Sequence, residues 1–309
     1  MSRKFQPDPT RTHPTLYMDF RLDRLATLYV MSPGLRLMPR RGLFVPILMY
    51  HSVSDIDESH AHAYYRTTTS PALFTAQMKC LHAEGYATCT LAQALEHLQA
   101  GTQVGKRHVV ITFDDGYRDF YQHAAPLLNN YGFSATVFLP TSYIGESPIS
   151  FKGKDCLTWA EIRELGKVGI TFGSHTVTHP QLYGLPIPDI RKEVVRSKQT
   201  IEQNVGFSIS SFSYPYAFPE TDATFKADLR QVLAEAGYAN GVCTTVGRAC
   251  SSSDRFFLNR LPVNSADDDA LFQAKLNGGY DWLAKPQYLL KMAKRWPPAK
   301  PRPHLATTA

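Results

Sequence analysis

The sequence predicts an α/β protein that folds as a closed or nearly closed barrel of seven or eight strands. Strand-like apolar runs alternate with helix-like runs from residue 44 to residue 284, which is typical of βα units with right-handed crossovers and a parallel sheet. No linker or internal repeat interrupts this stretch. A single (β/α) barrel commonly takes about 250 residues, so the stretch suits one barrel better than two small domains.

The expected strands are short runs rich in Val, Ile, Phe and Tyr, as expected for strands buried on both faces. They lie at residues 44–50, 108–113, 134–140, 169–173, 209–215, 238–244 and 256–263. Helices are expected between them, at residues 71–84, 91–100, 117–130, 159–167, 188–205, 222–236 and 268–277. Ser70 before Pro71, and Thr221 or Asp222 before the run at 222, are typical helix starts.

A short amphipathic helix is also expected over residues 16–30. Met18, Leu22, Leu25 and Tyr29 recur there at helical spacing. We expect this apolar stripe to pack on the body of the protein rather than on a membrane.

Polar residues with reactive side chains cluster at the carboxyl ends of the expected strands, where barrels carry their functional groups. Asp114 and Asp115 follow an apolar strand directly, where two charges are costly unless they are paired or coordinated. The alternative for this pair is a helix N-cap followed by a first-turn acid. Gly116 allows the sharp turn that would let both side chains be used.

Two histidines, His175 and His179, follow the strand at 169–173 and lie four residues apart. On a helical turn these residues would share one face, as zinc ligands often do. One carboxylate and two imidazoles make a three-ligand metal site that leaves a position open for water.

Three segments, ITFDDGY (111–117), SHTVTHP (174–180) and FSYPYA (212–217), resemble in this order the signature motifs of the polysaccharide deacetylases. This family is carbohydrate esterase family 4, also called the NodB-homology family, and the resemblance covers residues 44–284. The resemblance implies a distorted (β/α)7–8 barrel and a divalent metal, usually zinc. It also implies hydrolysis of N-acetyl groups on an amino-sugar-containing oligo- or polysaccharide, by a metal-activated water with an Asp base and a His acid.

Carried over by motif, Asp114 resembles the general base and Asp115 the metal ligand that acts with His175 and His179. Tyr216 resembles the residue whose backbone N–H stabilises the oxyanion. The segment PILMYHSV (46–53) is similar to a subgroup whose acid comes from the first strand, which makes His51 the expected acid. The alternative for His51 is a core histidine.

One position departs from the family pattern. Many members have an arginine two residues before the proline of the third motif, where it orients the base, and this chain has Ser213 there. Arg260, in the last expected strand, is our candidate for the missing charge. Its alternative is a surface salt bridge.

Two other functions remain open at this stage: an O-acetyl esterase on a polysaccharide, and a catalytically inactive barrel that binds glycans. The central residues 44–284 carry 19 basic and 24 acidic residues, and without a basic stripe they argue against a nucleic-acid enzyme. The five cysteines form no C-x-x-C motif and indicate neither a disulfide framework nor a zinc ribbon.

The basic character of the chain comes from its two ends. Residues 1–43 carry eight basic and three acidic residues, and residues 285–309 carry six basic residues and no acid. We therefore expect three parts: a basic extension at 1–43, partly disordered with a short helix, the barrel at 44–284, and a basic tail at 285–309. Basic tails are usually solvated, and weak contact with an anionic membrane is the alternative. No signal-peptide pattern begins the chain, so we expect a cytoplasmic protein, with a peripheral position at the inner membrane face as an option.

Overall fold

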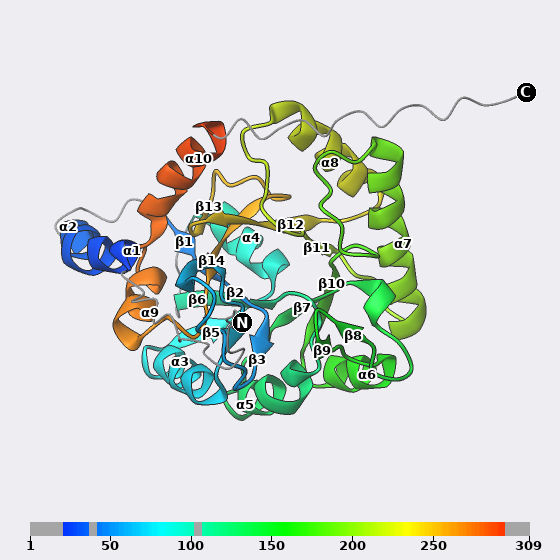
Figure 1. Cartoon of the computed structure of the whole chain (residues 1–309), viewed down its shortest axis with the longest axis horizontal. Coiled ribbons are helices and arrows are strands. Elements are labelled where there is room, and N and C mark those ends of the chain that lie inside the picture. Colours follow the sequence, from blue (N-terminus) through cyan, green and yellow to red (C-terminus); the bar gives the residue numbers. More distant parts are fainter. Residues whose placement is uncertain (1–20, 37–41, 102–106, 294–309) are drawn as a thin grey trace, which may run out of the picture.

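A closed barrel of seven parallel strands forms the centre of the computed structural model, which describes residues 21–36, 42–101 and 107–293 (Figure 1). Around the barrel the order is β2, β6, β7, β10, β11, β12 and β14, and β14 pairs again with β2. These strands are β2 (Ile47–Tyr50), β6 (Arg107–Phe113), β7 (Thr136–Leu139), β10 (Thr171–Ser174), β11 (Ser211–Ser213), β12 (Asn240–Val246) and β14 (Leu258–Pro262). The expected barrel is thus confirmed.

Strand β6 has a central position because it pairs with three neighbours. Its first residues pair with the short strand β5 (Tyr86–Thr88), and its last residues pair with β2 and β7. Residues Val109–Phe113 of β6 are fully or almost fully buried, as expected for a parallel strand covered on both faces. Strand β5 is the eighth strand of this sheet, and the sequence analysis did not find it.

Helices cover the outside of the barrel (Figure 1). They are α3 (Pro71–Ala83), α4 (Leu91–Ala100), η3 (Phe120–Ala124), α5 (Ala125–Asn130), α6 (Trp159–Lys167), α7 (Ile187–Val205), α8 (Ala223–Glu235), α9 (Asp269–Leu276) and α10 (Ala284–Ala293). The expected caps are present: Ser70 Oγ accepts from the N–H of Leu73, and the carboxylate of Asp222, rather than Thr221, accepts from the N–H of Phe225. The helix expected from residue 117 begins only at Phe120, because the turn after β6 extends that far.

Several two-residue strands are too short for a periodic pattern, and of these only Phe44–Val45 falls within an expected strand, the one at residues 44–50. They form three pairs: β1 (Phe44–Val45) with β13 (Ala249–Cys250), β3 (Ser52–Val53) with β4 (Thr68–Thr69), and β8 (Ser150–Phe151) with β9 (Lys154–Asp155). Single 3-10 turns complete the fold as η2 (Ala63–Tyr65), η4 (Thr141–Tyr143) and η5 (Asp281–Leu283).

The N-terminal helical segment differs from expectation in the side that it buries. It runs as α1 (Leu22–Ala26), η1 (Thr27–Met31) and α2 (Ser32–Arg36), and we call residues 22–36 the terminal arm. Leu22, Leu25 and Tyr29, which were expected to pack on the body, are exposed, while Met18 lies outside the described residues. The expectation was wrong because periodicity tells which residues share a face, but not which way that face points.

The C-terminal helix α10 lies in the stretch 285–309 that the sequence analysis assigned to a basic tail. It packs on β12 through Gln287, whose side chain accepts from the N–H of Val246 and donates to the carbonyl of Thr244. Among the described residues, no helix combines the length and the apolar character needed to cross a bilayer.

Gly173 of β10 gives a test of barrel packing. A Cβ at this position would lie 2.5 Å from the Phe138 ring and 2.7 Å from the Ser211 carbonyl oxygen. We expect Gly173→Ala to lower the free energy of unfolding by about 1–3 kcal/mol through overpacking, measured by chemical denaturation. Gly34→Ala, which meets no atom within 4 Å, is the matched control and should change stability by less than about 1 kcal/mol. Equal effects of the two changes would contradict this account.

Candidate active site

The barrel brings the expected site residues together at the carboxyl ends of its strands. Asp114 and Asp115 follow β6, His175 and His179 follow β10, and His51 follows β2. Tyr216 follows β11, and Arg260 lies within β14. Because parallel strands place all their carboxyl ends at one rim, residues far apart in the sequence share one site.

Asp114 and Arg260 form a buried, bidentate ion pair. Arg260 Nη1 lies 2.8 Å from Asp114 Oδ1, and Arg260 Nη2 lies 2.7 Å from Asp114 Oδ2. The residues are 2% and 0% exposed, respectively. Two parallel hydrogen bonds of this kind fix the plane of the carboxylate as well as its position.

The remaining donors of Arg260 are also used, which a buried guanidinium requires. Its Nε donates to the Cys243 carbonyl at 3.0 Å, and Nη1 lies 3.3 Å from Thr112 Oγ1. Ser213 Oγ contacts both partners, donating to Asp114 Oδ1 at 3.1 Å and accepting from Arg260 Nη2 at 3.2 Å. Position 213, where the family resemblance leads us to expect an arginine, thus carries a small hydroxyl, and the guanidinium comes from a different strand.

Burial opposes ionisation of Asp114, but the Arg260 guanidinium outweighs it and holds the pKa of this carboxyl at about 2. Asp114 is therefore a carboxylate near neutral pH. Oδ1 already accepts from Arg260 and Ser213, whereas Oδ2 accepts from Arg260 only. Oδ2 is consequently the oxygen with a lone pair left for a substrate or a water molecule.

His51 lies beside this free oxygen. Its Nε2 is 4.0 Å from Asp114 Oδ2, and its side chain is 21% exposed. Burial lowers the pKa of His51 below its ordinary value, although the carboxylates of Asp114 and Asp115 act in the opposite direction. With 21% of its side chain exposed, His51 is not fully enclosed in the core.

Asp115, His175 and His179 form a cluster with the composition of a metal site. One ligand atom from each lies within 4.8 Å of the other two. Asp115 Oδ1 lies 3.1 Å from His179 Nε2 and 3.5 Å from His175 Nε2. Although burial opposes ionisation of Asp115, the two imidazoles hold the pKa of this carboxyl well below its usual range.

The surroundings leave the right atoms of this cluster available for a metal. The Tyr117 hydroxyl donates to Asp115 Oδ2 at 3.0 Å, while Oδ1 is buried and has no hydrogen-bond partner among the described residues. His175 Nδ1 lies 2.8 Å from the Ser213 carbonyl oxygen, which can only accept, so Nδ1 carries the proton and Nε2 presents a lone pair. These residues fit a divalent cation.

The two histidines meet through a loop, and not through the helical turn expected from their spacing. Thr176 and His179 have φ of +71° and +54°, values that a helix excludes. Glu193 of α7 holds the loop, because its carboxylate accepts from the N–H groups of Val177 and Thr178. The loop therefore directs both imidazoles toward Asp115. Its backbone is strained, and the hydrogen bonds to Glu193 hold it in this conformation.

Positive φ values outside glycine concentrate at this site. In the described part of the chain, the non-glycine residues with positive φ are Asp115, Lys152, Thr176, His179 and Tyr216. Asp115 and His179 belong to the candidate metal cluster, and the Tyr216 ring lies 4.7 Å from that of His179. Strained backbone of this kind persists where the surrounding structure enforces it, which is common at functional sites.

Lys152 belongs to this group although the sequence did not single it out. It forms the tight β8–β9 turn with Gly153, and its Nζ lies 3.4 Å from Asp115 Oδ2 and 5.4 Å from the centre of the Tyr216 ring. Its side chain is 43% exposed, so it stands at the mouth of the site. In the sequence, only Gly153 indicated a turn at this point, because glycine favours tight hairpin turns.

Tyr216 has a left-handed backbone, with φ of +60°, and a half-exposed side chain. Its carbonyl oxygen accepts from Thr244 Oγ1 at 3.0 Å. Within the described residues its N–H has no hydrogen-bond acceptor. A cavity of about 1390 Å³ lies at the opposite end of the barrel, where Phe44, Arg107 and His108 line it, and is therefore separate from this site.

Comparison with known proteins gives consistent matches. A sequence model of the family described as polysaccharide deacetylase matches residues 101–241. YxkH of Bacillus subtilis (strain 168), provisionally named as a polysaccharide deacetylase, is 31% identical over 230 residues, covering 74% of this chain and 75% of YxkH. A protein of Staphylococcus aureus (strain N315) named poly-β-1,6-N-acetyl-D-glucosamine N-deacetylase is 25% identical over 240 residues, covering 72% of this chain and 79% of that protein.

Solved structures show the same fold. The deacetylase PplD of Streptococcus pyogenes, in complex with acetate, superposes with a TM-score of 0.66 at 24% identity, covering 76% of this chain and 99% of that one. IcaB from Ammonifex degensii superposes with a TM-score of 0.62 at 20% identity, covering 76% of this chain and 97% of that one.

The buried ion pair gives a stability test with a defined pH dependence. We expect Arg260→Met to lower the free energy of unfolding by about 3–5 kcal/mol at pH 7, because Asp114 then stays buried without its partner. The lowered pKa of Asp114 stabilises the wild type above the unfolded value of 3.8, and this contribution is lost as the pH falls toward 2. In the variant the pKa of Asp114 rises. The difference in the free energy of unfolding between the two proteins should therefore become smaller as the pH falls from 7 to 4.

Denaturation curves in the presence of a chelator measure this difference without any contribution from bound metal. Arg255→Met, at an exposed arginine, is the matched control and should stay within about 0.5 kcal/mol of the wild type. A pH-independent difference between wild type and Arg260→Met would show that the Asp114 charge is not its source.

Proposed function

We propose that this chain, which belongs to the polysaccharide deacetylase family, hydrolyses N-acetyl groups on an amino-sugar-containing oligo- or polysaccharide. The observation that carries the proposal is the Asp114–Arg260 pair directly beside the Asp115–His175–His179 cluster. Arg260 fixes the position of the Asp114 carboxylate, so this carboxylate stays apart from the three candidate metal ligands. A carboxylate held in this way beside a metal-type cluster suits hydrolysis of an unreactive acetamide. The name of the Staphylococcus aureus relative supports an N-acetylated glycan as the substrate class.

The candidate ligands are Asp115, His175 and His179, and we propose zinc as the ion. Two imidazoles, one carboxylate and an open position match catalytic zinc sites. A bound zinc ion supplies Lewis acidity and lowers the pKa of a water molecule. The protein's own residues then handle the protons and the charge.

Asp114 is our proposed general base. Arg260 holds it ionised, and its Oδ2 is free to accept a proton from the attacking water. The C–N bond of the acetamide breaks, the water oxygen becomes part of acetate, and the sugar nitrogen leaves as an amine that needs a proton. The N–H of Tyr216 is available to the carbonyl oxygen as negative charge develops there.

His51 is our proposed proton donor to the leaving nitrogen. Its lowered pKa makes the imidazole neutral at rest near pH 7, so it can donate only a proton that it has first received. Asp114 Oδ2, which would hold the proton taken from the water, is 4.0 Å from His51 Nε2. Such contacts are often long in a free site and tighten when substrate binds.

Acetate release from N-acetylated and O-acetylated glycans tests the function directly. Poly-β-1,6-N-acetylglucosamine serves as the N-acetylated probe and an O-acetylated xylan as the other. Release from the first but not the second supports the proposal, and the reverse favours the O-acetyl esterase. Glycan binding with metal present but without acetate release from either would favour the inactive binding barrel.

The two neighbouring aspartates should separate catalysis from metal binding. We expect Asp114→Asn to lower the deacetylation rate at least about a hundredfold while it keeps about one zinc per chain. Asp115→Asn should lose zinc, because it removes the carboxylate ligand. Zinc content by elemental analysis and acetate release are the measurements, and the opposite pattern would exchange the roles of the two residues.

Replacement of His51 should affect proton transfer alone. We expect His51→Ala to lower kcat by about a hundredfold with zinc content unchanged. His123→Ala, at an exposed histidine outside the site, is the matched control and should retain the wild-type rate. A wild-type kcat in His51→Ala would assign His51 to the core and not to the reaction.

A further inference from the structure

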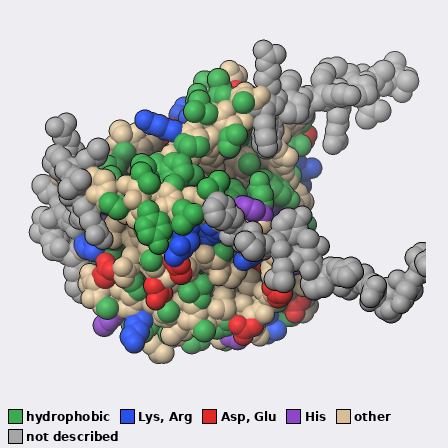
Figure 2. Space-filling model, turned by 60° about the vertical axis from the view of Figure 1, so that its left-hand side comes forward, with side chains coloured by type: hydrophobic (Ala, Val, Ile, Leu, Met, Phe, Trp, Pro, Cys, Tyr) green, Lys and Arg blue, Asp and Glu red, His purple; other side chains and the backbone are tan. Residues whose placement is uncertain are grey.

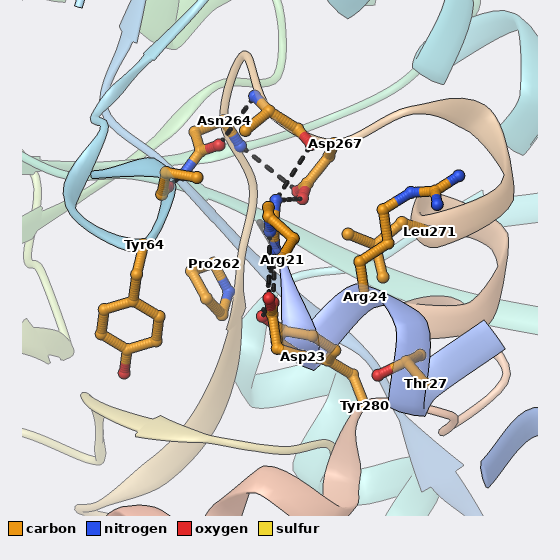
Figure 3. A network of polar contacts seen from close by, with 12 residues as sticks. Arg21, Asp23, Arg24, Thr27, Tyr64, Pro262, Asn264, Asp267, Leu271 and Tyr280 are labelled. Carbon is orange, nitrogen blue, oxygen red and sulfur yellow. Dashed lines mark hydrogen bonds and ion pairs between the residues drawn. The ribbon is translucent and has the colours of Figure 1, made fainter. Parts of the chain in front are cut away.

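The terminal arm (residues 22–36) is attached to the barrel by its polar side. Arg21, which precedes it, donates to the Ala266 carbonyl at 2.9 Å, and the Tyr280 hydroxyl donates to Asp23 at 2.7 Å (Figure 3). Trp282 Nε1 donates to Thr27 Oγ1 at 3.1 Å. The side chains that water would solvate best therefore face the protein.

The outward side of the arm is apolar. Leu22, Leu25, Tyr29 and Val30 are exposed, with Tyr29 at 71% and Val30 at 64%. On the inner side of the arm, Leu28, Met31 and Leu35 help to line the cavity of about 1390 Å³ at the end of the barrel opposite the site. The arm is thus held by a few polar contacts rather than by a packed core.

Helix α10 shows the same inversion. Gln287 and Lys291 face the barrel, where Gln287 bonds the backbone of β12 and Lys291 Nζ donates to the Phe218 carbonyl at 2.9 Å. The exposed residues of α10 are mainly apolar: Lys285, Tyr288, Leu289, Leu290, Met292 and Ala293.

The two inverted segments lie on one flank of the molecule. Helix α10 follows directly after η5, whose Trp282 contacts the arm. Figure 2 turns this flank toward the viewer and shows hydrophobic side chains gathered on it, with Lys and Arg nearby. We call the exposed residues the apolar flank: Leu22, Leu25, Tyr29, Val30, Tyr288, Leu289, Leu290 and Met292.

An apolar flank of this kind needs an apolar partner. A surface helix normally turns its polar face to water, and two inverted segments on one flank leave apolar area that water solvates poorly. Contiguous exposed apolar surface is typical of protein or membrane contacts. The charges around the flank distinguish between these two kinds of partner.

The charge distribution favours an anionic lipid surface. The two ends of the chain that carry the flank hold a large excess of basic residues, whereas residues 44–284 hold more acidic than basic ones. Lys285 of α10 is exposed beside the apolar residues. A second copy of the chain would bring like charges together, whereas anionic headgroups attract them. Tyr29 and Tyr288 are of the residue type enriched at lipid–water interfaces.

We propose that the apolar flank docks on the surface of a bilayer that contains anionic lipids. The arm and α10 would then lie in the plane of the interface, with their apolar side chains among the headgroups and the upper acyl chains. This proposal rests on the surface alone and is independent of the reaction at the barrel rim.

Vesicle co-sedimentation of the full-length protein tests the proposal. The probes are vesicles of phosphatidylcholine alone and vesicles with phosphatidylglycerol added, at a physiological salt concentration. We expect binding to the anionic vesicles and weaker binding to the neutral ones. Val30→Glu and Leu289→Glu should each lower the partition coefficient about tenfold, because each puts a charge into the apolar contact.

Val168→Glu is the matched control. It makes the same change in charge at an apolar residue of similar exposure outside the flank, 52% for Val168 against 64% for Val30, and should leave partitioning within about twofold. The absence of binding to anionic vesicles, or equal losses in all three variants, would overturn the proposal. So would a concentration-dependent dimer of the wild type that Val30→Glu and Leu289→Glu abolish, because a second copy would then cover the flank. Circular dichroism of each variant verifies folding.

Discussion

The ion pair between Asp114 and Arg260 is the contact on which the arrangement of the site depends. A carboxylate buried at the end of β6 costs several kcal/mol unless a cation accompanies it. The cation comes from β14, and it in turn needs acceptors from β6, β11 and β12 for its other donors. Closure of the barrel is therefore what makes a charged Asp114 tolerable, and the charge in turn helps to define how the strands meet.

Asp115 is the next residue, but it lies among imidazoles and not beside a guanidinium. The left-handed backbone at Asp115 and Gly116 turns the second carboxylate away from Arg260 and toward the two imidazoles. Glycine suits position 116, because its backbone is left-handed and a Cβ would lie 3.1 Å from the Leu139 side chain. Adjacent carboxylates thus have separate partners, one a guanidinium and the other a set of metal-type donors.

Much of this arrangement could be predicted from the sequence. The barrel strands are apolar runs because both their faces are buried, and their carboxyl ends carry the reactive residue types. Arg260 could be singled out because Ser213 left a carboxylate without its usual cation. Lys152 could not, since its β-hairpin is too short to have a periodic pattern. The direction of the terminal arm was also beyond reach, because the same spacing of apolar residues fits a helix that faces the core and one that faces away.

The inverted arm and α10 have a consequence for the evolution of the protein. They attach to the barrel mainly through hydrogen bonds, which water can replace at a modest cost in free energy. Insertions, losses or exchanges at the two ends of the chain would therefore leave the packing of the barrel largely intact. The two ends of the chain and the reaction centre are thus separable parts of this architecture, and a change in one need not disturb the other.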